Sequence, residues 1–141
     1  IIASHANARA LLREDPRDRQ LTDTVIRSLI ERGGTIGVLP YNRFLDSDWH
    51  PGSSRDNIKL EMLTEHIDHI CQIAGDALHV GIGTDFDGGF GLSSVPAEID
   101  NISDVQKLEP ILLKKGYEPE DVAAIFGTNW HRFLKIALPE N

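Results

Sequence analysis

Two places in the sequence put side chains that can do chemistry directly after a short apolar run. The first is His5, which follows Ile1-Ile2-Ala3, and the second is the segment GIGTDFDGG, which contains Asp85 and Asp87. A neutral imidazole can bind a divalent metal or accept a proton, and a carboxylate can act as an acid or a base. If both runs are parallel strands, these side chains share the sheet edge at which α/β proteins build their sites.

The paired aspartates allow several interpretations. Turn chemistry alone favours Asp and Gly after a strand. A calcium loop is excluded, because Gly89 stands at the third ligand position and Pro96 at the place of the closing glutamate. A haloacid-dehalogenase-like phosphatase would use Asp85 as the nucleophile and Asp87 as the acid. Its strand-DxDG(T/V) motif normally opens a domain and has Thr or Val where this chain has Gly89, but it stays open as an alternative.

Two further groups of polar residues lie outside these loops. His66 and His69 in HIDHIC have a spacing that could bind a metal from one side of a helix. Apolar neighbours surround them in the sequence and no further ligand is placed to complete a site, so we expect structural roles. Arg17 and Arg19 lie in the loop after His5, where a guanidinium could hold a carboxylate through two hydrogen bonds. A solvated run of charges is the alternative.

The elements that must position these residues alternate along the chain. Short β-rich apolar runs predict strands at 1–3, 35–39 (the run that Pro40 breaks) and 79–83. The spacing of apolar residues predicts helices over 22–33, 57–75, 104–116, 119–127 and 128–138. Ser103 and Gln106 have the spacing of a capping box ahead of the third of these helices, and Pro110 should kink that helix or restart it.

This order predicts the α/β class. No hairpin signal separates the strands, so we expect them to be parallel and buried on both faces, the opening run 1–3 included. Three strands are few for a closed sheet, and they would leave unpaired edges and uncovered apolar surface. We therefore expect the chain to be the last part of a longer barrel.

Composition excludes several classes of function. The formal net charge is −8 and no long cluster of Lys and Arg occurs, which argues against a nucleic-acid partner. Cys71 is the single cysteine, so neither an internal disulfide nor a Cys-rich zinc module can form. No apolar run reaches the roughly 18 residues that a membrane span needs. We expect a cytoplasmic protein without a membrane segment.

Six segments, in this order, together resemble the C-terminal part of the membrane (renal) dipeptidase family, including its bacterial members. They are ASHANARAL, DRQLTD, GGTIGVLPYN, HIDHICQIAG, HVGIGTDFDGG and KKGYEPEDVAAIFGTNWHRFL. The resemblance implies a metallo-dependent hydrolase with a TIM-like (β/α)8 barrel and a binuclear zinc site that hydrolyses dipeptides. Residues 1–141 would be the C-terminal part of that single barrel domain, roughly its last three βα units.

The resemblance also assigns binding residues. His5 lies in the family's strand-S-H motif and would be a ligand of the second zinc ion. Arg19 matches the arginine of the family's R-x-L-x-D motif, which Asp23 closes, and would bind the C-terminal carboxylate of the dipeptide. The segment between His5 and Arg19 is slightly longer than in some relatives, so Arg17 remains an alternative for that role.

Asp85 is the first aspartate of the family's D-F-D-G motif. By resemblance it would bind substrate beside the zinc-bound hydroxide and handle protons at the tetrahedral intermediate. Asp87 would be its structural companion. Because the two zinc ions would generate the hydroxide, the chemistry needs no protein nucleophile.

The sequence departs from the family in one respect. The family's His-x-Asp on its first strand, its bridging glutamate and its other zinc histidine would lie upstream of residue 1. His5 alone cannot hold two zinc ions, so we expect the isolated chain to be inactive. We also expect it to associate with itself or with the missing N-terminal half. A non-catalytic metal-binding or structural α/β module is the second alternative.

Overall fold

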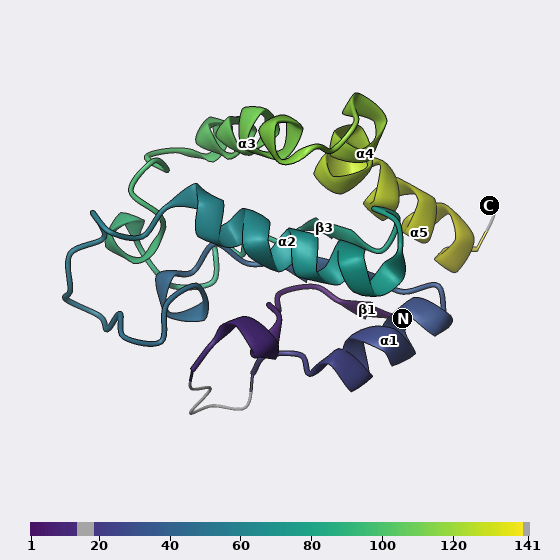
Figure 1. Cartoon of the computed structure of the whole chain (residues 1–141), viewed down its shortest axis with the longest axis horizontal. Helices are drawn as coiled ribbons and strands as arrows, with labels where there is room; N and C mark the ends of the chain where they lie inside the picture. The colour runs from purple at the N-terminus through teal and green to yellow at the C-terminus, as the bar shows by residue number, and fades with distance from the viewer. Residues whose placement is uncertain (14–18, 140–141) are drawn as a thin grey trace.

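The computed structural model describes residues 1–13 and 19–139 (Figure 1). Its centre is a sheet of three parallel strands, which pair in chain order: β1 (Ile2–Ala3), β2 (Thr35–Val38) and β3 (Val80–Ile82). Helical segments follow each strand. The α/β class and the parallel pairing predicted from the sequence are therefore confirmed.

The described residues form five α-helices: α1 (Asp23–Glu31), α2 (Leu60–Ala74), α3 (Leu108–Lys115), α4 (Pro119–Ala123) and α5 (Asn129–Ala137). Figure 1 shows α2 in front of the strands, with α1 on one side of it and α3 and α4 on the other. One π-helical turn, Ala124–Thr128, joins α4 to α5 without a break. Within the described residues, no helix has both the length and the apolar character that a membrane crossing requires.

One face of the sheet forms the core with α2. Ile36, Val38 and Val80 are completely buried and belong to the same cluster as Ile67 and Ile70 of α2. Side chains alternate along a strand, so the residues between these isoleucines and valines point to the opposite face. Burial on this face holds the carboxyl ends of β2 and β3 in register.

The opposite face of the sheet carries glycines. Gly37 of β2 lies directly opposite Gly81 of β3. Trp130 of α5 covers both, since a Cβ on either glycine would collide with its ring. The indole Nε1 of Trp130 donates a hydrogen bond of 3.1 Å to the carbonyl of Ile82. These glycines therefore leave room for the Trp130 ring directly against the two strands.

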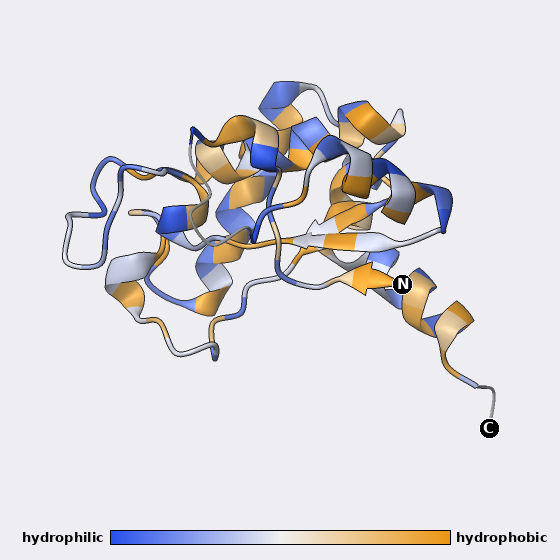
Figure 2. Cartoon of the chain, turned by 90° about the horizontal axis from the view of Figure 1, so that it is seen from below, coloured by the Kyte–Doolittle hydropathy of each residue, from blue (hydrophilic) through white to orange (hydrophobic). Residues whose placement is uncertain are grey.

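The opening strand does not have the burial that its sequence predicts. Ile1 is 60% and Ile2 44% exposed, because β1 pairs with β2 on one side and none of the described residues forms a strand on its other side. Leu134 and Ile136 of α5 are also exposed. Figure 2 shows the hydrophobic colour on the strand beside the N-terminus and on parts of the helix that leads to the C-terminus. The prediction that residues 1–3 form a buried strand is wrong for this chain.

The start of the third predicted helix also differs from the prediction. Asn101 and Asp104 form the capping box, in place of Ser103 and Gln106. The reason is that a 3-10 turn (Ile102–Lys107) precedes α3, so the first free amide groups occur earlier. α3 then begins just before Pro110, which agrees with a restart of the helix.

Candidate functional site

The side chains of His5 and Asp85 meet at the carboxyl edge of the sheet. His5 follows β1 and Asp85 follows β3, and the imidazole Nε2 lies 3.9 Å from the carboxylate Oδ1. The side chains are 40% and 31% exposed, so both groups can be reached from solvent. The structure thus brings together the two strand-end residues that the sequence analysis selected first.

Glycines permit this approach. The carbonyl oxygen of Ser4 sits where a Cβ on Gly37 or on Gly83 would have to be. The amide of Ala6 donates a hydrogen bond of 2.9 Å to the carbonyl of Gly37, and the amide of Gly83 donates one of 2.8 Å to the carbonyl of Val38. The chain that leaves β1 therefore passes over the end of β2 and reaches the chain that leaves β3.

The backbone of Asp85 is in a conformation that few side-chain-bearing residues adopt. Its φ is +50°, the left-handed region, in which Asp and Asn are enriched. The Asp85 carbonyl accepts a hydrogen bond of 2.8 Å from the amide of Gly88, and a Cβ on Gly88 would be 2.5 Å from the Asp85 carboxyl carbon. Strained backbone of this kind clusters at functional sites. The turn presents the Asp85 carboxylate toward His5.

The imidazole of His5 fits as one ligand of a metal site, because imidazole nitrogen is a common zinc ligand. The Asp85 carboxylate, 3.9 Å from Nε2 of His5, lies where it could exchange protons with water or substrate beside such an ion. The other ring nitrogen of His5, Nδ1, is buried and has no hydrogen-bond partner among the described residues. The described residues contain no group of three or more His, Cys, Asp or Glu that could hold a metal ion. A complete site would therefore need ligands from elsewhere.

Arg19 is exposed and lies on a segment that runs beside the chain after His5. Ala8 forms a parallel bridge with Leu21, and the amide of Leu21 donates a hydrogen bond of 2.9 Å to the carbonyl of Asn7. These bonds place the residues just after Arg19 beside the chain that follows His5. Arg17, the alternative, lies outside the described residues.

The two helix histidines have structural contacts, as the sequence predicts. His66 is 1% exposed, and its Nδ1 accepts a hydrogen bond of 3.2 Å from the amide of Ala8. Burial, helped by the nearby His69, lowers the pKa of His66 to about 4, so the ring is neutral at pH 7. His69 Nε2 lies 2.8 Å from Asp23 Oδ1 and ties α2 to α1.

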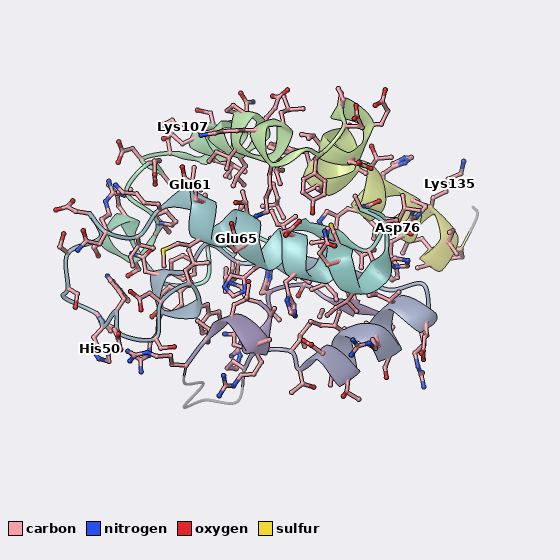
Figure 3. All side chains as sticks on the ribbon, viewed as in Figure 1. His50, Glu61, Glu65, Asp76, Lys107 and Lys135 are labelled. Atoms are coloured by element: carbon pink, nitrogen blue, oxygen red, sulfur yellow. The ribbon has the colours of Figure 1, made fainter. Side chains whose placement is uncertain are left out.

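A separate polar cluster lies between α2 and α3, and Figure 3 labels one of its members, Glu65. Lys115 Nζ is 2.8 Å from Glu65 Oε1, and the hydroxyl of Tyr117 donates a hydrogen bond of 2.8 Å to Asp68.

The single cysteine, Cys71, is buried, and this burial raises the pKa of its thiol to about 11. Cys71 is thus a protonated thiol at neutral pH, which argues against its use as a nucleophile.

One residue near the site was missed by the sequence analysis. Asn7 is completely buried, two residues after His5, and its side chain bonds to the backbone of the loop that follows β2. Its partners are more than thirty residues away in the sequence, so no local spacing reveals them. The available signal is a lone amide side chain among small residues next to a candidate ligand.

The chain is similar in sequence to several known proteins, and two of them illustrate the match. The chain is 33% identical to an uncharacterized protein in the pqqA 5′ region of Klebsiella pneumoniae, over 96% of this chain and 46% of that protein. It is 30% identical to dipeptidase ataJ of Aspergillus terreus, over 96% of this chain and 30% of that protein. The chain therefore spans less than half the length of these relatives.

The chain is also similar to solved structures. A metallopeptidase from Rhodobacter sphaeroides, liganded with a phosphinate mimic of the dipeptide L-Ala-D-Ala, superposes with a TM-score of 0.79. It is 28% identical and aligns with 95% of this chain and 35% of its own.

The model of the family described as membrane dipeptidase (Peptidase family M19) matches residues 1–139. The chain belongs to the membrane dipeptidase family.

Proposed function

We propose that this chain is part of a metal-dependent dipeptidase and supplies His5, Arg19 and Asp85 to its active site. Family membership supports the reaction class. The observation that carries the assignment is the 3.9 Å approach of His5 Nε2 and Asp85 Oδ1, from the ends of two strands that are not neighbours. Such convergence at the carboxyl edge of a parallel sheet is the usual arrangement of an α/β active site.

The chain would form the C-terminal portion, about three βα units, of a (β/α)8 barrel. Two observations support this proposal. The chain aligns with 35% of the length of the Rhodobacter sphaeroides metallopeptidase. The free side of β1 and the exposed apolar residues of α5 are surfaces that further barrel units would cover. The remaining ligands would come from those units, either through an N-terminal half or through association of chains.

His5 would hold one of two zinc ions, with the imidazole as a neutral donor. Bound metal ions of this kind activate water and polarise the carbonyl of the peptide bond. Asp85 would contact the substrate and move a proton between the attacking water and the leaving amine. Its half-buried carboxylate beside His5 suits that role, because part of the side chain remains open to substrate.

Arg19 would bind the substrate carboxylate. Arg19 is exposed and precedes Leu21, whose amide bonds to the carbonyl of Asn7, so its side chain starts close to the segment that carries His5. A planar guanidinium pairs with a carboxylate through two hydrogen bonds. The phosphinate dipeptide mimic in the Rhodobacter sphaeroides structure supports dipeptides as the substrate class.

The phosphatase alternative has less support. Asp87 would have to act as the acid beside Asp85, but it is exposed to solvent. The family model that matches residues 1–139 describes dipeptidases and not phosphatases. We therefore retain the dipeptidase proposal.

The direct experiment measures metal content and dipeptide hydrolysis by the complete enzyme. Removal of metal with a chelator should abolish hydrolysis, and added zinc should restore it. His5→Ala should lose one metal and nearly all turnover, because a methyl group cannot coordinate. His131→Ala is the matched control, since His131 is exposed on α5. Unchanged metal content and rate in His5→Ala would contradict the assignment.

A further inference from the structure

Asn7 joins the chain after His5 to the loop that follows β2. Its Nδ2 donates hydrogen bonds to the carbonyls of Leu39, at 3.0 Å, and Phe44, at 3.1 Å. Its Oδ1 accepts a hydrogen bond of 2.8 Å from the amide of Leu39. The side chain therefore supplies hydrogen bonds to backbone groups of Leu39 and Phe44. Asn7 is completely buried, so water cannot supply these hydrogen bonds at its place.

The backbone of Asn7 makes a second connection. Its amide donates a hydrogen bond of 2.8 Å to Oε1 of Gln20, which is itself buried. Its carbonyl accepts the hydrogen bond from the amide of Leu21. Asn7 thus holds three segments together: its own, which carries His5, the segment that carries Arg19, and the loop after β2.

The His5 ring has little else to fix it. Its side chain is 40% exposed, and its Nδ1 has no hydrogen-bond partner among the described residues. The position of the imidazole therefore depends on the backbone from Ser4 to Ala8. Histidine ligands of metals are normally oriented by neighbouring hydrogen bonds, and removal of such contacts lowers affinity or activity. Here the hydrogen bonds act on the backbone two residues away.

We propose that Asn7 is a positioning residue, which sets where His5 stands relative to Asp85 and to the Arg19 segment. The kinetic part of this inference rests on the proposed dipeptidase function. The structural part does not, because it concerns the place of the His5 ring. Asn7 itself touches neither substrate nor metal in this account.

Asn129 provides a matched control. It is 1% exposed, and its Nδ2 donates to two backbone carbonyls, those of Ala77 at 2.7 Å and Val80 at 2.8 Å. It therefore resembles Asn7 in burial and in the bonds that it donates. It lies at the amino end of β3, away from the edge that carries His5 and Asp85. Asn7→Ala and Asn129→Ala should thus be similar in lost stability and different in their effect on the site.

The experiment combines two readouts on the complete enzyme. In NMR spectra, Asn7→Ala should shift the imidazole resonances of His5 and leave those of His131 in place, while Asn129→Ala should leave His5 unchanged. In kinetics with a dipeptide, Asn7→Ala should lower kcat by roughly 10- to 100-fold more than Asn129→Ala. The KM should change less than kcat, because Asn7 does not contact substrate.

A second pair of variants applies if Asn7→Ala does not fold. Gln20→Ala removes the acceptor of the Asn7 amide, and Gln20→Glu retains an acceptor oxygen there. Gln20→Ala should shift the His5 resonances, and Gln20→Glu should restore them. Equal shifts and equal rate losses in Asn7→Ala and Asn129→Ala would overturn the inference. If the unmodified enzyme hydrolyses no dipeptide, the proposed function fails. The NMR shifts of His5 then test by themselves whether Asn7 positions the His5 ring.

Discussion

The imidazole of His5 and the carboxylate of Asp85 lie 3.9 Å apart across the end of a strand to which neither belongs. The carbonyl of Ser4 occupies the space that side chains on Gly37 and Gly83 would fill. A bulkier residue at either position would push the chain after β1 away from β3. Gly37 and Gly83 therefore control the geometry of the candidate site.

This relationship predicts that Gly83→Ala damages the site. The new Cβ would collide with the Ser4 carbonyl and would lie 3.1 Å from Nδ1 of His5. We expect a loss of about 1–3 kcal/mol of stability, typical of overpacking, together with weaker metal binding. Gly91→Ala is the control, because nothing lies within 4 Å of its added Cβ. Thermal unfolding and metal titration of both variants test this, and equal behaviour of the two would refute it.

Asp85→Asn should separate catalysis from metal binding. Asn also tolerates the left-handed backbone at this position, so the turn should persist. We expect bound metal to remain and kcat to fall by roughly 10²-fold or more, as for loss of a positioned acid-base group. Asp87→Asn, in the same turn but exposed, should keep most of its rate. A rate in Asp85→Asn as high as in Asp87→Asn would remove Asp85 from the mechanism.

Arg19→Ala should act mainly on KM. A bond to the substrate carboxylate forms in the ground state and is retained in the transition state, so its loss weakens binding without slowing bound substrate. The dipeptide amide, which lacks the carboxylate, should be affected much less. Arg27→Ala, exposed on α1, serves as control. A normal KM in Arg19→Ala would move the role to Arg17, which the parallel variant Arg17→Ala would reveal.

His66 should make stability depend on pH. Its pKa is lowered from 6.5 to about 4, mainly by burial, so the unfolded chain binds a proton more readily than the native one. The contribution is complete above about pH 6.5 and is lost as the pH falls toward 4, by roughly 3 kcal/mol in all. His66→Gln cannot titrate and should show a flatter dependence across this window. Parallel curves for the two proteins in urea unfolding would contradict the expectation.

Signals from neighbouring residues in the sequence predicted the helices and several of their ends. Gly75 and Gly116 end α2 and α3 in the left-handed conformation, as glycine after an apolar helical pattern indicates. Thr22 caps α1 through a hydrogen bond from the amide of Val25. These features depend on neighbouring residues alone, so a single sequence contains them.

Contacts between distant segments could not be predicted in the same way. Ile2 reads as a buried residue, but its burial depends on what lies beside β1, which the local pattern does not contain. Asn7 has partners in the loop after β2, and His66 has one in the segment after His5. Both are polar residues whose roles depend on three-dimensional neighbours. The strand-end positions of His5 and Asp85 were predictable, because parallel strands end at the same edge.

The central claim is that this chain carries one part of a dipeptidase site and needs further barrel units to complete it. The most direct measurement is dipeptide hydrolysis with metal analysis, on residues 1–141 alone and together with the preceding barrel units. We predict no hydrolysis and association or aggregation for the chain alone, and metal-dependent hydrolysis for the combination. A monomeric 141-residue chain that hydrolyses a simple dipeptide in the presence of zinc would contradict the account.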